Sequence, residues 1–179
     1  MATTSLMTAE QFDKLPPEEG LRYELLHGEM VEMSSANPVH NLIQAILTAA
    51  LAGFLLERRL GVVLPDTEFD FGESRLRPDL SYLPEERWAR MDHFKVPVSE
   101  MPAIAVEIVS PSESAYAVDK KTGIYLQAGI SEVWVIYPET KHLYVHTASE
   151  VRHLTSAAVM ESPLLPGWSL PVGDLFSRL

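Results

Sequence analysis

A carboxylate at position 107 interrupts an otherwise apolar segment of this sequence. Residues 103–109 read Ala-Ile-Ala-Val-Glu-Ile-Val, and an almost continuous apolar run is typical of a strand buried on both faces of a sheet. A charged carboxylate in such a strand costs several kcal/mol unless it is paired or binds a metal ion. Glu107 therefore forms a buried salt bridge, lies at the rim of a strand that ends early, or belongs to a functional site.

Two more charged residues stand in unusual surroundings. Asp79 follows Pro78 and begins a segment, residues 79–83, that we interpret as a strand, although an aspartate in this place is also a common turn or cap residue. Lys121 lies in a helical segment, where its ammonium either pairs inside the protein or reaches solvent along its own stem. Lys120 is expected to point outward. The neighbours of Lys121 on its helix face are apolar or aromatic, namely Ala117, Val118, Ile124, Tyr125 and Ala128.

Together, Asp79, Glu107 and Lys121 have the chemistry of a metal-dependent site that acts on phosphates. Two carboxylates from neighbouring strands supply the oxygen ligands that a hard divalent cation such as Mg²⁺ prefers. Such a cation acidifies or orients a water molecule and stabilises charge on a phosphate. A nearby lysine can position that water or stabilise the pentavalent phosphorus. Mutual neutralisation would also explain why three costly charges occur among apolar residues.

Several segments, spread over nearly the whole chain, carry these residues in a specific order. They are Tyr23–Met33, His40, Arg77–Asp79, Val106–Ser112, Asp119–Lys121, Tyr125–Gly129 and Glu132–Pro138. This ordered set resembles the Uma-two family of endonucleases, in the restriction-endonuclease-like, or PD-(D/E)XK, superfamily. The resemblance implies one α/β domain over residues 1–179, with a mixed central β-sheet flanked by helices and with residues 1–20 as an N-terminal arm and short helix. It also implies a metal-dependent endonuclease that hydrolyses the phosphodiester bonds of DNA.

Carried over residue by residue, the resemblance gives each site residue a role. Asp79, Glu107 and Glu24 become the ligands of Mg²⁺ or Mn²⁺, and all three join Lys121 as expected catalytic residues. In the usual superfamily pattern a lysine follows the second acid by two residues, but this chain has Val109 there. The family supplies its lysine from the following helix instead, and Lys121 matches that place.

The elements that position these residues follow from apolar periodicity and turn residues. A strand over 103–109, a helix from Ser112 or Ser114 to about Ala128, and a strand over 133–137 indicate a crossover in a mixed sheet. Residues 38–60 predict a long amphipathic helix that Gly61 ends. Other expected elements are a helix from about Ala9 that Pro16 and Pro17 end, a hairpin over 21–33, strands over 62–71 and 79–83, a helical turn over 84–90, a loop over 93–102, a hairpin over 143–147 and 151–154, and a short helix after Pro171.

The composition limits the partners of this chain of 179 residues. Its net charge is −11, whereas proteins that hold nucleic acid over their whole surface are usually basic. DNA must therefore meet a local patch or metal ions, and the candidate basic residues are Arg22, Arg75, Arg77 and Lys120. The absence of cysteine excludes disulfides, zinc–thiolate sites and cysteine nucleophiles, and it fits a cytoplasmic protein. Residues 45–56 form the longest apolar stretch, which is too short to span a membrane, and no membrane contact is expected.

Other polar and aromatic residues carry weaker signals. His40 could contact a phosphate or act as a base, but it could equally cap a helix or form an ordinary hydrogen bond. His142 and His146 flank Tyr144 at strand spacing, and we expect an edge-strand surface there rather than a metal site. The tryptophans are expected in the core or at an interface; they are Trp88, Trp134 and Trp168.

Two other functions are compatible with the sequence. One is a binding module that keeps the nuclease fold without catalysis, which the net charge of −11 favours. The other is a metal-dependent hydrolase of a small phosphorylated substrate, which should lack the steep salt dependence of binding to a long polymer. A homodimer would suit the cutting of both strands of a duplex and is predicted on that ground.

Overall fold

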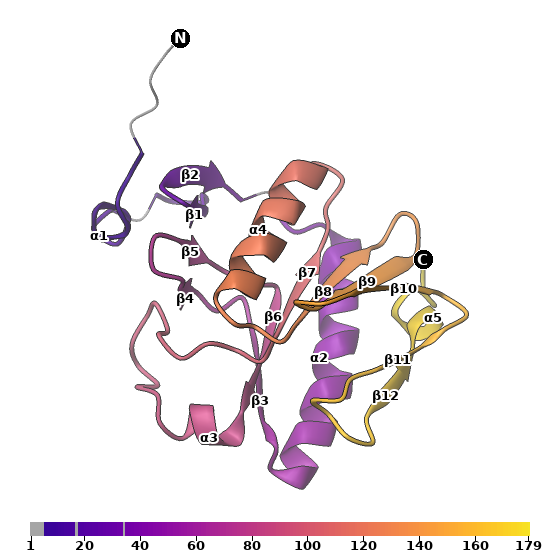
Figure 1. The fold of residues 1–179 in the computed structure, drawn as a ribbon. Helices are drawn as coiled ribbons and strands as arrows, with labels where there is room; N and C mark the ends of the chain where they lie inside the picture. Colours follow the sequence, from indigo (N-terminus) through magenta and orange to yellow (C-terminus); the bar gives the residue numbers. More distant parts are fainter. Residues whose placement is uncertain (1–5, 17, 34) are drawn as a thin grey trace.

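A six-stranded mixed sheet forms the centre of the computed structural model, which describes residues 6–16, 18–33 and 35–179 (Figure 1). β7 and β8 run parallel, and every other neighbouring pair runs antiparallel. Residues 1–5 of the expected N-terminal arm and Pro17, expected to end the first helix, lie outside the described residues. The strands lie in the order β10 (Val151–Thr155), β9 (His142–His146), β8 (Glu132–Tyr137), β7 (Ile104–Ile108), β6 (Leu80–Pro84) and β3 (Gly61–Pro65).

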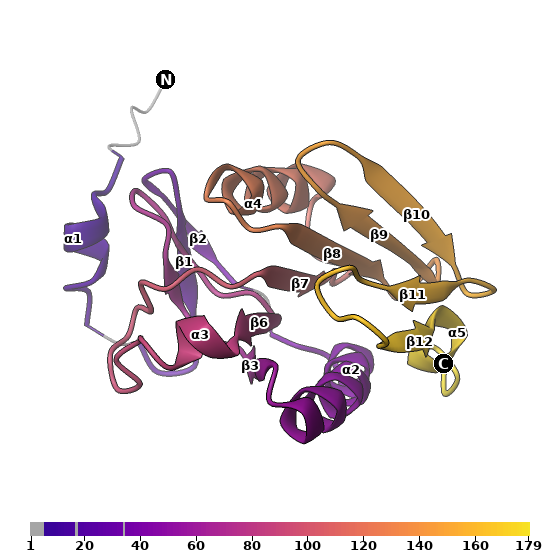
Figure 2. The same ribbon diagram turned by 60° about the horizontal axis from the view of Figure 1, so that its bottom comes forward.

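Helices cover both faces of this sheet, as the sequence predicts (Figure 2). α4 (Ala115–Gln127) joins the parallel strands β7 and β8 and packs on one face, while α2 (Pro38–Arg58) packs on the other. Every residue of β7 is buried. Because side chains alternate along a strand, Ala105 and Glu107 face α4, whereas Ile104 and Val106 join the core beneath α2. The order strand, helix, strand therefore places Glu107 between the sheet and α4.

α2 packs on the sheet through one apolar stripe. Its residues Ile43, Leu47, Leu51 and Leu55 recur at helical spacing and are buried in the main core. The helix ends at Arg58, earlier than expected, because Arg59 adopts the left-handed conformation that ends helices. Gly61, expected as the stop, instead opens β3. A Cβ at this position would lie 2.1 Å from the carbonyl oxygen of Leu83, so the strand pairing requires glycine.

By length and composition alone, α2 is apolar enough to cross a membrane, and no other helix in the described ranges is. The expectation drawn from residues 45–56 is therefore wrong for the complete helix, which has 21 residues. In the fold, the Ile43, Leu47, Leu51 and Leu55 stripe packs against β-strands. The core of a folded domain accounts for the apolar character of this stripe.

The predicted strand over 62–71 is two strands in two different sheets. β3 ends at Pro65, Asp66 has a φ of 46°, and the chain resumes as β4 (Phe69–Asp70). β4 belongs to a smaller sheet whose order is β2 (Glu29–Glu32), β1 (Tyr23–Leu26), β5 (Arg75–Leu76) and β4. Pro65 and Asp66 are common turn residues, so the sequence carries a signal for this break that the prediction of one strand passed over. The expected hairpin over 21–33 is present as β1 and β2.

The C-terminal residues add a small layer beside α2. A hairpin of β11 (Val159–Glu161) and β12 (Ser169–Pro171), which the sequence did not predict, is followed by the expected short helix α5 (Val172–Leu175). The ring of Trp168 stacks on Trp134 of β8 with centroids 5.6 Å apart, and both are buried, as expected. Two short helices lie outside this layer. Near the other edge of the sheet, Trp88 ends the short helix α3 (Glu85–Trp88) and stacks on His93. α1 (Ala9–Phe12) begins at the expected residue, with a capping box at Thr8.

Candidate functional site

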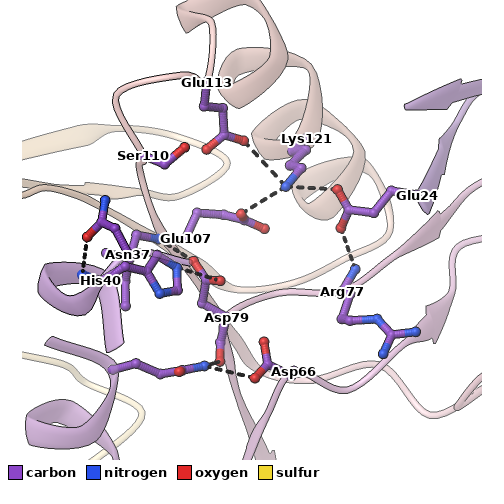
Figure 3. Close-up of polar contacts among 12 residues, drawn as sticks. Glu24, Asn37, His40, Asp66, Arg77, Asp79, Glu107, Ser110, Glu113 and Lys121 are labelled. Carbon is purple, nitrogen blue, oxygen red and sulfur yellow. Dashed lines mark hydrogen bonds and ion pairs between the residues drawn. The ribbon is translucent and has the colours of Figure 1, made fainter. Parts of the chain in front are cut away.

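Glu107 is buried, and α4 contacts both oxygens of its carboxylate. Figure 3 shows the contact with Lys121. Lys121 Nζ lies 3.1 Å from Oε2, and the hydroxyl of Tyr125 donates to Oε1 over 2.5 Å. Only 3% of Glu107 is exposed. The alternative that β7 ends early and leaves Glu107 at its rim is therefore wrong, and the buried position is correct.

Lys121 is buried among carboxylates. Its ammonium lies 2.9 Å from Glu24, 3.1 Å from Glu107 and 3.5 Å from Glu113. With 8% of its side chain exposed, Lys121 does not extend into solvent. Lys120 points away from this cluster, as predicted, and pairs with Glu29 on β2 at 2.7 Å.

Asp79 is held at the point where the chain enters β6. Its Oδ2 accepts the backbone N–H of Ile108, next to Glu107, and its Oδ1 lies 3.0 Å from Nε2 of His40. Its backbone carbonyl accepts a hydrogen bond from the side chain of Gln44. Asp79 is thereby tied to β7 on one side and to α2 on the other, and it is more than a local turn residue.

His40 joins the site from the first turn of α2. The sequence left open whether it contacts a phosphate, caps the helix or forms an ordinary hydrogen bond. Asn37 is the cap, since its side chain accepts the backbone N–H of His40. The imidazole of His40 instead contacts Asp79, and its Nδ1 is buried. Sequence reasoning undervalued His40 because the pairing partner lies 39 positions further along the chain and on another element.

Glu24 reaches the same cluster from β1 of the smaller sheet. One oxygen accepts the backbone N–H of Arg77 over 2.7 Å, and the other lies 2.9 Å from Lys121. Only 2% of Glu24 is exposed. The structure therefore brings together the four residues singled out in the sequence, Glu24, Asp79, Glu107 and Lys121, although they come from four separate elements.

Burial dominates the electrostatics of the cluster. Loss of solvation raises the pKa of Glu107 to about 8, against the lowering effect of Lys121, and Asp79 and Glu24 raise it further. Burial also raises the pKa of Glu24. For Lys121, burial lowers the pKa, but Glu107, Glu24 and Glu113 outweigh it and hold the pKa well above its ordinary value. The cluster therefore has more buried acid than one lysine can neutralise.

The excess of carboxylates over ammonium groups in this cluster matches the charge that a divalent cation would need. The carboxylates of Glu24, Asp79, Glu107 and Glu113 supply oxygen donors around one ammonium, which is the donor chemistry that Mg²⁺ and Mn²⁺ prefer. Within the described ranges, no three His, Asp or Glu side chains already converge as a metal cage, because their oxygens face protein donors. The chain fits a cation in charge and in ligand type.

A pocket of about 770 Å³ opens onto these residues. It is bounded by the first turn of α2, the start of α4 and the β1–β2 hairpin. Glu24, His40, Asp79, Glu107 and Lys121 all line it. More acids than bases face the pocket, and the further acidic lining residues are Glu32, Asp66 and Glu113.

Of the four basic residues suggested for DNA contact, the structure places one beside this pocket. Arg22 lines it. Arg75 is buried and pairs with Asp13 and Asp70 at 2.8 and 2.6 Å, so its expected role in contacting DNA is wrong. The side chain of Arg77 pairs with Glu68, and that of Lys120 with Glu29. These ion pairs leave Arg22 as the basic candidate at the pocket.

Tyr125 and Glu113 belong to the cluster, and sequence reasoning missed both. A signal for Tyr125 was present, because it follows Lys121 by four positions and therefore shares its helix face. Its ring was interpreted only as part of the apolar surroundings of Lys121. Glu113 precedes α4 in a loop, where no periodicity indicates the direction of a side chain.

The histidines of β9 form an aromatic surface away from the pocket. His142, Tyr144 and His146 share one face, and His153 of β10 stacks on Tyr144 with centroids 4.7 Å apart. β10, and not β9, is the edge strand, so the expected surface lies one strand inside the edge of the sheet. Burial lowers the pKa of His146.

Residues 9–173 match the model of a family, Uma2, that is described as "Putative restriction endonuclease". The chain belongs to the Uma2 family. This match confirms the resemblance inferred from the ordered motifs. It supports a nuclease role for this Uma2 protein.

The Uma2 fold seen here is similar to a solved structure. The crystal structure of "a putative nuclease belonging to DUF820" from Anabaena variabilis ATCC 29413 superposes with a TM-score of 0.84 at 23% sequence identity. The likeness covers 96% of this chain and 98% of that one, and it confirms the mixed sheet flanked by helices. No curated protein matches the chain.

Proposed function

We propose that this Uma2 protein is a metal-dependent endonuclease that hydrolyses the phosphodiester bonds of DNA. One observation carries the proposal: Glu107, Asp79 and Glu24 line one pocket together with the buried Lys121. Burying several carboxylates costs free energy, and a bound divalent cation would offset that cost by supplying positive charge. The family match supports the nuclease role.

Asp79, Glu107 and Glu24 would hold Mg²⁺ or Mn²⁺. When bound, such a cation supplies a more acidic water and stabilises charge on the phosphate oxygens. Asp79 is fixed by His40 and by the backbone N–H of Ile108, so its carboxylate keeps one orientation. Glu107 is held by α4 on both oxygens. Ligands fixed in this way need little reorganisation when the substrate binds.

Lys121 orients the attacking water and stabilises the transition state. In hydrolysis, the water oxygen forms a bond to phosphorus while one P–O ester bond breaks, and the leaving oxygen takes up a proton. The pentavalent phosphorus carries more negative charge on its oxygens than the diester does. The neighbouring carboxylates keep the ammonium of Lys121 charged. This positive charge stabilises the negative charge on the phosphate oxygens throughout the reaction.

A small phosphorylated substrate is the second candidate. A pocket of about 770 Å³ falls in the range of small-molecule sites, and the only basic side chains in its lining are those of Arg22, His40 and Lys121, within the described residues. Binding of a long nucleic acid releases many counterions and weakens steeply as salt rises, whereas binding of one small phosphate does not. The salt dependence of binding therefore separates the two candidates.

Titration of Mg²⁺ and Mn²⁺ by calorimetry, together with nicking of supercoiled plasmid, tests the proposal. Asp79→Ala and Glu107→Ala should each lose metal binding and nicking, and Glu86→Ala, an exposed acid on α3, should keep both. Linear plasmid as the product would mean that the protein cuts both strands, which the predicted homodimer would explain. Binding without nicking would favour the small substrate, and no binding by the wild type at millimolar metal would contradict the proposal and favour a non-catalytic module.

A further inference from the structure

The two donors on Glu107 come from adjacent turns of one helix. Lys121 and Tyr125 are four positions apart on α4, so their side chains lie on the same face. Lys121 contacts Oε2 of Glu107 and the hydroxyl of Tyr125 donates to Oε1. One helix face thereby determines the orientation of this carboxylate.

Lys121 and Tyr125 differ in what else they contact. Lys121 is shared among Glu24, Glu107 and Glu113, so its charge serves the whole cluster. The hydroxyl of Tyr125 donates its hydrogen bond to Glu107. The hydroxyl therefore acts on one carboxylate, and its loss should be felt first there.

The ring of Tyr125 has a separate, structural function. It is fully buried, belongs to the core between α4 and the sheet, and contacts the ring of Phe71 with centroids 5.3 Å apart in an edge-on arrangement. Phenylalanine would fill the same space. The core therefore needs the ring, whereas only the hydrogen bond to Glu107 needs the hydroxyl.

We propose that Tyr125 is a positioning residue, whose hydroxyl holds Glu107 in the orientation that binds the metal ion. The inference rests on the proposed function. Without this donor, the carboxylate of Glu107 can rotate about its last bond within the pocket wall. Hydrogen-bond partners of metal-ligating carboxylates commonly change metal affinity or activity by about 10- to 100-fold when they are removed.

Tyr125→Phe tests the inference on the full-length protein, with Mn²⁺ alone as the probe. We expect calorimetry to show Mn²⁺ affinity weakened by about 10-fold or more, and the electron paramagnetic resonance spectrum of bound Mn²⁺ to change. Excess Mn²⁺ should restore much of the plasmid nicking. Tyr82→Phe is the matched control, because Tyr82 is also buried and donates its hydroxyl to the carbonyl of Leu60 on the other side of the sheet.

The control separates positioning from general stability. Each variant loses one hydrogen bond made by a buried tyrosine, to Glu107 in one case and to the part-buried carbonyl of Leu60 in the other. Urea denaturation should therefore show some loss of stability in both, while Mn²⁺ affinity should fall only in Tyr125→Phe. Equal Mn²⁺ affinity in Tyr125→Phe and the wild type would overturn the inference and leave the proposed function standing. Equal weakening in both variants would also overturn it. A wild type that binds no Mn²⁺ would overturn the proposed function and this inference together.

Discussion

The ammonium of Lys121 lies 3.1 Å from the carboxylate of Glu107, although a loop and two turns of helix separate the two residues. Glu107 lies on β7 of the sheet, and Lys121 lies on α4, which packs on the sheet face that Glu107 occupies. The crossover between two parallel strands makes this contact, because it returns the chain over the face that Glu107 occupies.

Removal of the Lys121 charge should destabilise the metal-free protein. Lys121→Met keeps most of the apolar stem but leaves Glu24 and Glu107 buried without their cation, which commonly costs about 3 to 5 kcal/mol. Mn²⁺ should restore part of the loss, since it would supply positive charge to the same carboxylates. Urea denaturation with chelator and with Mn²⁺ measures both effects.

Lys120→Met is the control for this experiment. Lys120 pairs with the exposed Glu29, and surface pairs of this kind contribute about 1 kcal/mol or less. A Lys121→Met variant as stable as Lys120→Met would mean that the buried carboxylates do not depend on the ammonium.

The stability of the metal-free protein should fall as pH rises from about 4.5 to about 8. Burial raises the pKa of Glu107 from its ordinary 4.5 to about 8, so the folded state binds this proton more tightly than the unfolded state. The corresponding stability is fully present below about pH 4.5 and is lost as pH rises through the folded-state pKa. Glu107→Gln keeps the shape of the neutral acid and should remove this dependence.

The measurable quantity is the difference in unfolding free energy between Glu107→Gln and the wild type. It should shift in favour of the variant by several kcal/mol across this range, because one pKa unit corresponds to about 1.4 kcal/mol. Urea denaturation from pH 4.5 to 8.5 without metal checks it. Glu86→Gln on the surface should show no such trend, and a pH-independent difference for Glu107→Gln would contradict the raised pKa.

Loss of the His40 imidazole should loosen Asp79. His40 Nε2 lies 3.0 Å from Asp79 Oδ1, and both side chains are mostly buried. We expect His40→Ala to weaken Mn²⁺ binding and to slow plasmid nicking by about 10- to 100-fold. His93→Ala, at a surface position beside Trp88, should change neither value. If both variants behave alike, His40 does not support Asp79.

Substitution of Arg75 should lower stability, whereas substitution of Arg22 should weaken DNA binding. Arg75 is buried and pairs with Asp13 and Asp70, so Arg75→Ala should lower the free energy of unfolding by about 3 kcal/mol. Arg22 lines the pocket, so Arg22→Ala should leave stability nearly unchanged and weaken DNA binding. Its log–log slope of affinity against salt should fall by about one if the guanidinium meets a phosphate.

Urea denaturation and fluorescence anisotropy with labelled DNA measure these two effects. Arg75→Ala should keep the salt slope of the wild type under conditions where it is folded. A reduced slope in Arg75→Ala and an unchanged one in Arg22→Ala would show that the assignment is reversed.

Much of the fold could be read from the sequence because its signals are local. The apolar run at 103–109 and the periodicity of residues 38–60 each correspond to an element that the structure contains. The errors came where a turn signal was passed over or where no pattern exists. Residues 62–71 were expected as one strand, yet they divide between two sheets at Asp66, directly after Pro65, and both are common turn residues. β11 and β12 are too short to show alternation.

The sequence alone determined which side chains are out of place: a glutamate in a strand of apolar residues, an aspartate at the start of another strand, and a lysine on an apolar helix face. Residue type and spacing suffice for this because burial follows periodicity. Only the tertiary structure decided how they are paired. The contacts of Asp79 with His40, of Glu24 with Lys121 and of Tyr125 with Glu107 join different elements. Their distances depend on how sheets and helices pack, which local spacing does not encode.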